Sequence, residues 1–269
     1  MDSVESSASR DLTAALPQLT PWPDAAVCGI RAGFMGRRGG VSEGRYASFN
    51  LAHWVGDDAA AVAENWRRWR AANPALRPVI LTQVHRAEVI RVRRGDAIVI
   101  GDRPCADGMV TTEAGVALGI FSADCVPILL YDATAHAAAA LHAGWRGTLA
   151  NIVEAGLDAI TDAGAHRNRL RAAIGPAIGA CCFEVDRELA DEFRRRIPAA
   201  ASFTRSGLPG KAYLDLTGIV RSQLEAVGIN PEAIRTFGTC TRCYADDYFS
   251  RRAAGGVTGL QMSFIGFDD

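Results

Sequence analysis

The chain has 269 residues, of which 49% are hydrophobic and 22% charged, so it can bury a substantial core and is too apolar to be disordered. Its 29 basic and 30 acidic side chains nearly cancel, which argues against nucleic acid or an anionic membrane as a partner. Seven cysteines, an odd number at irregular spacing, indicate reduced thiols in the cytoplasm and not a disulfide framework.

The N-terminal segment, residues 1–22, is polar and lacks the basic start and apolar run of a signal peptide. We expect it to be a weakly structured lead-in. No tract rich in proline, glycine and serine, as expected of a linker, divides the rest of the sequence. We therefore predict a single domain over residues 23–269. Near its start, residues 33–50 are rich in glycine and arginine, Arg37 among them. This segment is either an anion-binding loop or a solvated surface loop.

Apolar residues recur at helical spacing over residues 58–72, where Val62, Trp66 and Trp69 would share one face. Apolar runs of strand length and further amphipathic stretches follow in alternation. The predicted strands cover residues 78–85, 116–121, 126–132, 137–145, 170–175 and 234–240, and further helices start at 148 and cover 186–197 and 215–227. Thr148 is the expected N-cap of its helix.

Strands that alternate with helices favour an α/β domain with layered packing. The alternation is too irregular for a TIM barrel or a plain doubly wound sheet. The most apolar stretch, residues 116–131, is interrupted by Ser122, Asp124 and Pro127, and it is too short to span a bilayer. The pattern therefore predicts no membrane segment.

Three side chains able to bind a metal stand at or just after the ends of predicted strands, namely His85, Cys125 and His142. Two imidazoles and a thiolate suit a catalytic zinc ion, because three protein ligands leave a fourth position for water or substrate. The same residues also suit a cysteine hydrolase, with Cys125 as nucleophile, His142 or His85 as base and Asp124 orienting the histidine. A third interpretation gives the three residues no shared function: Cys125 would be a buried thiol, and the two histidines would be unrelated and satisfied by hydrogen bonds. Five histidines are too few for a multicopper oxidase.

The other cysteines give weaker signals. Cys240 and Cys243 form a CxxC, which without a second pair is at most half of a structural zinc site. The adjacent pair Cys181–Cys182 is expected to pack against apolar surface. Cys28 and Cys105 have no recognisable pattern around them.

Four motifs make the chain similar to a known family: ADGMVTT (106–112), FSADCVPILLYD (121–132), LHAGWRGT (141–148) and IGPAIGACCFEV (174–185). With LTQVH upstream, they closely resemble the laccase-domain family, whose members are also called purine nucleoside phosphorylases or polyphenol-oxidase-like proteins. The similarity runs from about residue 33 to 265. Departures from the family pattern include Arg37 after Gly36, Trp54 in place of a common histidine, and Leu260 in place of a usual arginine.

This resemblance implies that His85, Cys125 and His142 bind one zinc ion. It also implies a monomeric enzyme with a layered α/β/β/α fold and mixed sheets, distantly like the cysteine-hydrolase domain of a deamidating toxin. The implied reaction cleaves adenosine, inosine and methylthioadenosine with phosphate to the base and ribose 1-phosphate, with adenosine deamination as a side activity. Two alternatives stay open: a cysteine hydrolase acting on an amide or peptidoglycan precursor, and a non-catalytic zinc-binding partner protein.

Roles for individual residues follow from these readings. Cys125, His142 and Asp124 are the predicted catalytic residues, with Asp124 either moving a proton or orienting the site. Arg146 lies four residues after His142 and is the first candidate for binding phosphate, with Arg37 as the second. The aspartate of ADG at position 107 could equally be a turn residue, so it is not among the predicted catalytic residues.

Overall fold

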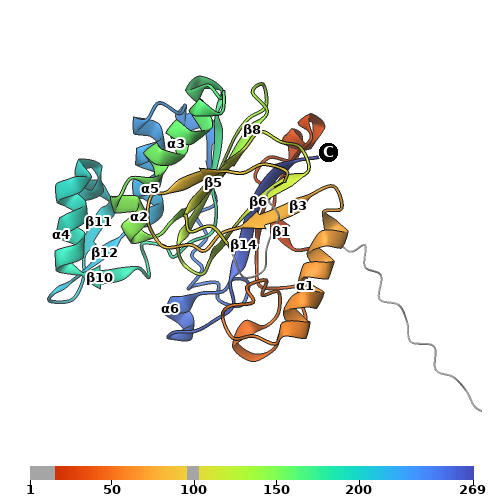
Figure 1. Cartoon of the computed structure of the whole chain (residues 1–269). Coiled ribbons are helices and arrows are strands. Elements are labelled where there is room, and N and C mark those ends of the chain that lie inside the picture. The colour runs from red at the N-terminus through yellow and green to blue at the C-terminus, as the bar shows by residue number, and fades with distance from the viewer. Residues whose placement is uncertain (1–15, 96–102) are drawn as a thin grey trace, which may run out of the picture.

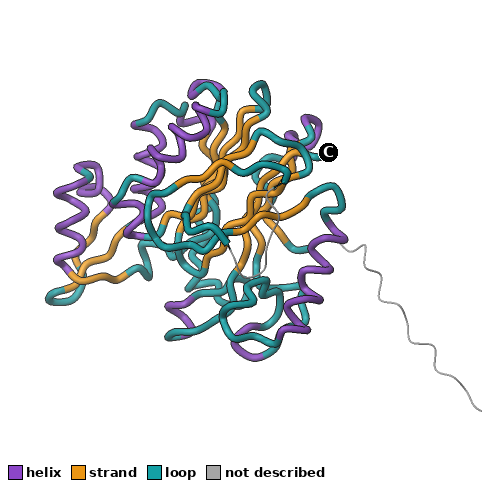
Figure 2. The backbone as a smooth tube through the Cα atoms, in the orientation of Figure 1, coloured by secondary structure: helices purple, strands orange, loops and turns teal. Residues whose placement is uncertain are grey.

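The protein is described here by a computed structural model covering residues 16–95 and 103–269, in which two large β-sheets face each other (Figures 1 and 2). The first sheet has the order β1-β2-β14-β6-β3. Its strands are β1 (Gln18–Leu19), β2 (Ile30–Met35), β14 (Gln261–Phe267), β6 (Val116–Ser122) and β3 (Arg77–Ile80). Only the β3–β6 pair is parallel among these strands.

The second large sheet has the order β13-β9-β7-β8-β5-β4, and a small antiparallel sheet has the order β10-β12-β11. The former comprises β13 (Ile234–Thr236), β9 (Arg171–Ile174), β7 (Val126–Asp132), β8 (Ala137–Ala143), β5 (Gly108–Thr111) and β4 (Val89–Arg91). The latter comprises β10 (Glu184–Asp186), β12 (Lys211–Leu214) and β11 (Thr204–Ser206). In the six-stranded sheet, β13–β9 and β4–β5 are parallel and the other pairs antiparallel.

A hydrophobic core fills the space between the two large sheets. Leu118 and Ile265 of the first sheet pack there with Leu129 and Ala140 of the second, all fully buried. Alternate residues of the same strands point the other way, as expected for pleated strands buried on both faces. Each large sheet therefore needs a second apolar layer on its outer face.

Helices supply these outer layers. On the five-stranded sheet lies α1 (Ala59–Ala72), whose buried Trp69 packs edge-on against Phe264 with 5.3 Å between ring centroids. The six-stranded sheet is covered by α3 (Ile152–Asp162) and α5 (Leu216–Ala226), with α4 (Arg187–Arg196) beside the small sheet. The remaining helices are α2 (Trp145–Leu149), α6 (Arg251–Ala254) and the 3-10 turns Pro23–Cys28, Gly44–Tyr46, Arg167–Arg169, Pro198–Phe203 and Pro231–Ala233. The layers confirm the mixed α/β single domain expected from the sequence.

Most predicted elements are confirmed. The helix predicted over 58–72 is α1, and the Asp58 side chain caps it by accepting a hydrogen bond from the Ala61 N–H at 2.8 Å. The strands predicted at 116–121, 126–132 and 137–145 form β6, β7 and β8, and the helices predicted at 186–197 and 215–227 form α4 and α5. The last two helices differ from prediction by only one residue at each end.

Thr148 does not cap a helix, contrary to the prediction. It lies inside α2, where its hydroxyl donates to the Gly144 carbonyl at 3.0 Å, and the next helix begins only after Asn151. Asn151 has φ of +62°, a left-handed conformation that interrupts the helical path.

Two predicted strands were too long. The strand expected over 78–85 ends at Ile80, and that expected over 234–240 ends at Thr236. In the first case the backbone N–H groups of Val84 and His85 donate to a side chain, and so are not available to a neighbouring strand.

The domain boundary also lies earlier than predicted. Residues 1–15 lie outside the described residues, but β1 and Trp22 belong to the folded domain. Trp22 is buried with its ring centroid 4.6 Å from that of Tyr131. Among the described helices, none has the length and apolar character needed to cross a membrane.

Replacing Trp69 by alanine tests the outer helical layer. Because Trp69 is fully buried against Phe264, the variant should lose about 3–5 kcal/mol of unfolding free energy, measured by chemical denaturation. Leu208→Ala is the control: Leu208 is 70% exposed, so its loss should change the stability by less than about 0.5 kcal/mol. Equal effects of the two substitutions would contradict this packing.

Candidate active site

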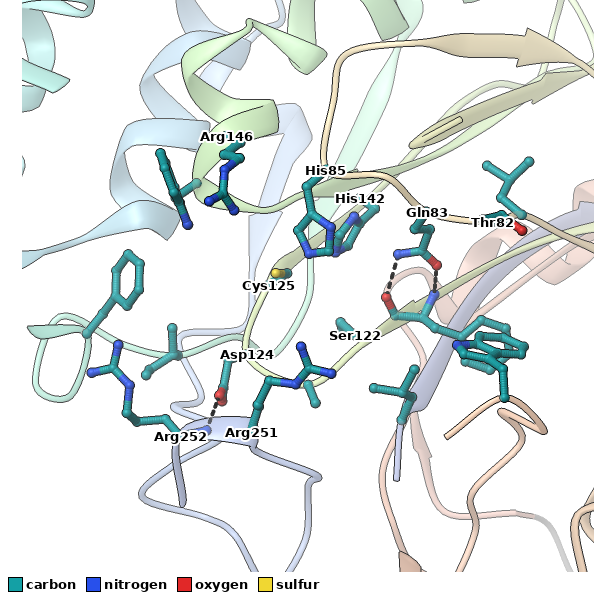
Figure 3. Close-up of a pocket in the computed structure, with 18 of the residues that line it drawn as sticks. Thr82, Gln83, His85, Ser122, Asp124, Cys125, His142, Arg146, Arg251 and Arg252 are labelled. Atoms are coloured by element: carbon teal, nitrogen blue, oxygen red, sulfur yellow. Dashed lines mark hydrogen bonds between the residues drawn. The ribbon is translucent and has the colours of Figure 1, made fainter. Parts of the chain in front are cut away.

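The three predicted metal ligands converge at one edge of the facing sheets. His85 comes from the loop after β3, Cys125 from the turn between β6 and β7, and His142 from the end of β8. Their donor atoms all lie within 4.8 Å of one another, and the two imidazole rings face each other edge-on with centroids 4.9 Å apart (Figure 3). The site is thus assembled from three segments distant in sequence.

Asp107 organises two of these ligands. Its carboxylate, fully buried, accepts the backbone N–H groups of Val84 at 3.1 Å, His85 at 2.9 Å and Arg86 at 2.7 Å. The same carboxylate is 2.8 Å from Nδ1 of His142. Since Nδ1 is engaged, Nε2 is the nitrogen that His142 can present to Cys125 or to a metal.

Gly144 provides the space beneath the cluster. A Cβ atom at this position would lie 2.9 Å from the His85 ring and 3.2 Å from the Cys125 sulfur. His85 itself has φ of +59°, a conformation rare for residues with a side chain. The local backbone is therefore shaped around the convergence of these three donors.

Charge coupling shifts the pKa values in the cluster. Burial opposes ionisation of Cys125, but the charge of His142 and hydrogen bonds from His142 and His85 outweigh it and lower the pKa of the thiol to about 6. Burial likewise opposes protonation of His142, while the Cys125 thiolate and Asp107 raise the pKa of this imidazole to about 9. Near neutral pH Cys125 is therefore a thiolate and His142 an imidazolium. The pair can bind a metal cation if His142 loses its proton, or Cys125 can act as a nucleophile with His142 as the acid.

The cluster lies in a cavity of about 710 Å³, a volume within the usual range of about 300–1,000 Å³ for small-molecule sites. Aromatic side chains line part of it, including Trp54, Phe121 and Phe183. Four guanidinium groups line it as well, those of Arg103, Arg146, Arg251 and Arg252. A nearly neutral protein thus carries a locally positive cavity, which favours an anionic ligand.

Comparison with known proteins gives a consistent picture. A protein-family model described as multi-copper polyphenol oxidoreductase laccase matches residues 31–268. The purine nucleoside phosphorylase SCO2081 of Streptomyces coelicolor is 41% identical over 247 residues, covering 90% of this chain and 97% of the relative. The purine nucleoside phosphorylase YlmD of Geobacillus stearothermophilus is 37% identical over 252 residues, covering 88% and 90%.

The chain belongs to the laccase-domain family.

Solved structures agree with this membership. The crystal structure of the Geobacillus YlmD superposes with a TM-score of 0.83 at 37% identity, covering 90% of this chain and 93% of that one. The hypothetical protein YfiH of Bacillus licheniformis gives a TM-score of 0.87 at 30% identity, covering 95% and 98%. The fold and the sheet arrangement described above are therefore those of the laccase-domain family.

Asp124 lies next to a predicted ligand but faces away from it. Its carboxylate accepts the Thr241 hydroxyl at 2.7 Å and the Arg252 backbone N–H at 2.7 Å, as Figure 3 shows for the latter. Its backbone has φ of +98°. In this laccase-domain protein Asp124 therefore holds the Cys125 turn against the start of α6, which favours the orienting role over proton transfer.

The two arginines predicted to bind phosphate lie in different surroundings. Arg146 lines the cavity at the start of α2, with its guanidinium 4.1 Å from the centre of the Trp145 ring. Arg37 does not line the cavity. It donates to the carbonyls of Ala47 at 2.6 Å and Ala245 at 2.7 Å, so it ties the Gly-rich loop to the C-terminal part of the chain.

Several site residues were missed in the sequence. Asp107 is not among the predicted catalytic residues because an aspartate in ADG equally suits a turn, although its place within a family motif is an available signal. Arg251 and Arg252 stand in a C-terminal segment that enters the site only through the fold. Ser122 is 4% exposed and lines the cavity with no hydrogen-bond partner for its hydroxyl among the described residues. No local pattern marks that hydroxyl.

Substituting Asp107 by asparagine tests its organising role. The amide cannot accept all four hydrogen bonds, so we expect zinc affinity at the cluster to fall about 10–100-fold, measured as the zinc concentration that protects Cys125 from alkylation. Asp132→Asn is the matched control, because Asp132 is also buried and accepts backbone N–H groups, at the opposite end of β7. An equal loss of zinc affinity in both variants would show that Asp107 acts only through stability.

The pKa of Cys125 gives a second test, on metal-free protein. Below pH 6 the sulfur is a thiol and reacts slowly, and above it the thiolate reacts fast, so the alkylation rate at Cys125 should be half-maximal near pH 6. Asp107→Asn should move this midpoint upward, because it weakens the positive charge on His142. Peptide-resolved mass spectrometry measures the rate at this residue alone. A wild-type midpoint near the ordinary thiol value of about 8.5 would contradict the coupling.

Proposed function

We propose that this protein is a zinc-dependent purine nucleoside phosphorylase. It would cleave adenosine, inosine and methylthioadenosine with phosphate to the free base and ribose 1-phosphate, and deaminate adenosine as a side activity. The observation that carries the proposal is one cavity that holds both a His–Cys–His donor set and four arginines. Relatives at 37–41% identity are named purine nucleoside phosphorylases, which supports the reaction class.

The donor set fits zinc. Two imidazoles and one thiolate are ordinary zinc ligands, and Asp107 holds His142 so that Nε2 faces the other donors. When bound, zinc supplies a Lewis acid that can polarise an oxygen of phosphate or substrate, or lower the pKa of water for deamination. Despite the family's multi-copper description, no second donor group within residues 16–95 and 103–269 contains a histidine.

The arginines fit phosphate. Arg103 is the most distinctive, because its Nε and Nη1 atoms are buried without a hydrogen-bond partner among the described residues. Its guanidinium lies 3.7 Å from the centre of the Trp54 ring, which fixes its plane. Together with Arg146 it would bind phosphate oxygens and place negative charge near the sugar, where positive charge develops as the glycosidic bond breaks.

The aromatic part of the cavity fits a purine. Trp54 is 39% exposed and contacts Phe121 edge-on, with ring centroids 5.0 Å apart. A flat base stacked on such a surface would gain dispersion and apolar burial. The hydroxyl of Ser122, which has no hydrogen-bond partner within residues 16–95 and 103–269, is available to a polar atom of the substrate. The nearby Gln83 side chain is already occupied, because its amide donates to the Phe121 carbonyl and accepts the Phe121 N–H (Figure 3). It would therefore not take the place of Ser122 in binding the substrate.

A cysteine hydrolase is the second candidate, and one observation favours it. Cys125, His142 and Asp107 stand in the order nucleophile, base and orienting carboxylate, with the thiol pKa lowered to about 6. The expected likeness to a toxin's cysteine-hydrolase domain points the same way, toward an amide or peptidoglycan precursor as substrate. A zinc-binding protein without catalysis is the third candidate.

For all three candidate functions we propose that the protein is a monomer in the cytoplasm, where its seven free thiols would stay reduced.

An assay with adenosine and inosine, with and without phosphate, tests the proposal. Release of base should depend on phosphate and should fall by more than about 100-fold in His85→Ala and Cys125→Ala, because even residues that only orient metal ligands contribute about 10–100-fold. His166→Ala is the matched control, since His166 is exposed and outside the cavity, and its activity should be unchanged.

The second candidate predicts the opposite pattern. A cysteine hydrolase would keep its activity after chelation and accumulate a covalent adduct on Cys125, with no dependence on phosphate. A zinc-containing protein with no turnover of either nucleoside would favour the non-catalytic alternative.

A further inference from the structure

We propose that Cys181, Cys182, Cys240 and Cys243 form a second metal site, a structural four-thiolate zinc site separate from the cavity. The four sulfur atoms all lie within 4.8 Å of one another. The fold brings together the two pairs that looked unrelated in sequence, so the CxxC has the second pair that a structural zinc site requires. This inference does not depend on the proposed function.

The spacing of the sulfurs suits a tetrahedral cation. Zinc–sulfur bonds of about 2.3 Å at tetrahedral angles place sulfurs about 3.8 Å apart. Here the Cys243 sulfur is 3.5 Å from both the Cys181 and the Cys182 sulfurs. Small adjustments of side-chain torsions would equalise the remaining separations, because Cys181 and Cys243 are exposed and free to adjust.

The backbone around the sulfurs has features of a thiolate site. The N–H of Gly179 donates to the Cys240 sulfur at 3.2 Å, a contact that favours the ionised ligand. Gly179 leaves little room for a side chain, since a Cβ atom there would lie 3.1 Å from Cys240 Cβ and 3.3 Å from the Cys181 sulfur.

The local charge also suits a bound cation with four thiolates. Four thiols and one Zn²⁺ give a complex of charge −2 with release of four protons. Arg242 lies beside Cys182, with its guanidinium in contact with the sulfur-bearing side chain. Arg252 donates to the Cys182 carbonyl at 3.3 Å. Two cations therefore flank the cluster and would offset part of its negative charge.

A disulfide explains the arrangement less well. It would join two sulfurs at about 2.05 Å and leave the other two without a role. Cys243 is equally distant from two candidate partners, and adjacent cysteines such as Cys181 and Cys182 rarely have suitable geometry for bonding each other. A disulfide is therefore an outcome that the experiment must distinguish.

The position of the cluster indicates what the metal would do. It would join the loop after β9 to the segment after β13, which already meet through a bridge between Ala177 and Cys240. Within the CxxC, the Thr241 hydroxyl donates to Asp124, next to Cys125. Ile178 and Phe183, on either side of the cysteine pair, line the cavity. A metal here would fix one wall of the active site without touching substrate.

Metal analysis of the full-length protein tests the proposal. Purified under reducing conditions with zinc and then desalted, the wild type should hold two zinc ions per chain by plasma mass spectrometry. Cys240→Ser/Cys243→Ser should hold one, and so should His85→Ala/Cys125→Ser, in which only the four-cysteine site remains. Cys28→Ser/Cys105→Ser is the matched control and should still hold two, because both residues lie outside the two clusters.

Cobalt substitution of His85→Ala/Cys125→Ser adds a readout independent of activity. It should show the intense thiolate-to-cobalt absorption and tetrahedral d–d bands of a four-sulfur site. This variant keeps all four cysteines of the second cluster, so it carries the test even if Cys240→Ser/Cys243→Ser does not fold.

Either of two results would overturn the inference: no zinc in His85→Ala/Cys125→Ser, or a disulfide among the four cysteines in wild type purified under argon. Failure of the proposed function is distinguishable, since it would leave the second zinc ion in place.

Discussion

The candidate active site depends on one buried carboxylate. Asp107 accepts hydrogen bonds from three successive backbone N–H groups, those of residues 84–86, and so bends the chain out of β3 and places His85. Through its contact with Nδ1 of His142 it also fixes the ring that β8 delivers and helps to keep it protonated. A side chain that does not line the cavity therefore positions two of the three donors. Through His142 it also influences the ionisation of Cys125.

Sequence reasoning succeeded where physical signals are local. Continuous apolar runs predicted β6, β7 and β8 because strands buried on both faces need no polar alternation, and the 58–72 periodicity predicted α1. The sequence did not predict which strands pair with each other when they lie far apart along the chain. In the described structure β14 lies between β2 and β6, which precede it by more than a hundred residues. The strand predicted over 78–85 ends early because the N–H groups of Val84 and His85 donate to the Asp107 side chain.

The candidate site shows the same difference between features that the local sequence predicts and features that only the fold reveals. Residue chemistry, with the family resemblance, identified the three donors of the candidate metal cluster, but only the fold shows that Asp107 orients two of them. Likewise the CxxC at 240–243 looked incomplete until the parallel pairing of β13 with β9 placed it beside Cys181 and Cys182. The arginines of the cavity come from three distant parts of the chain, so a net charge of −1 gave no sign of a positive site. Asp124 links the two sulfur-containing clusters through Thr241.

We propose that zinc binds between His85, Cys125 and His142, in a cavity that also binds phosphate. The most direct measurement is an anomalous difference map at the zinc edge, from crystals grown with zinc, phosphate and a non-cleavable adenosine analogue. We expect a peak within bonding distance of all three side chains, phosphate on Arg103 or Arg146, and the base against Trp54. A map with no anomalous peak at these residues, or with ligands bound elsewhere, would contradict the account.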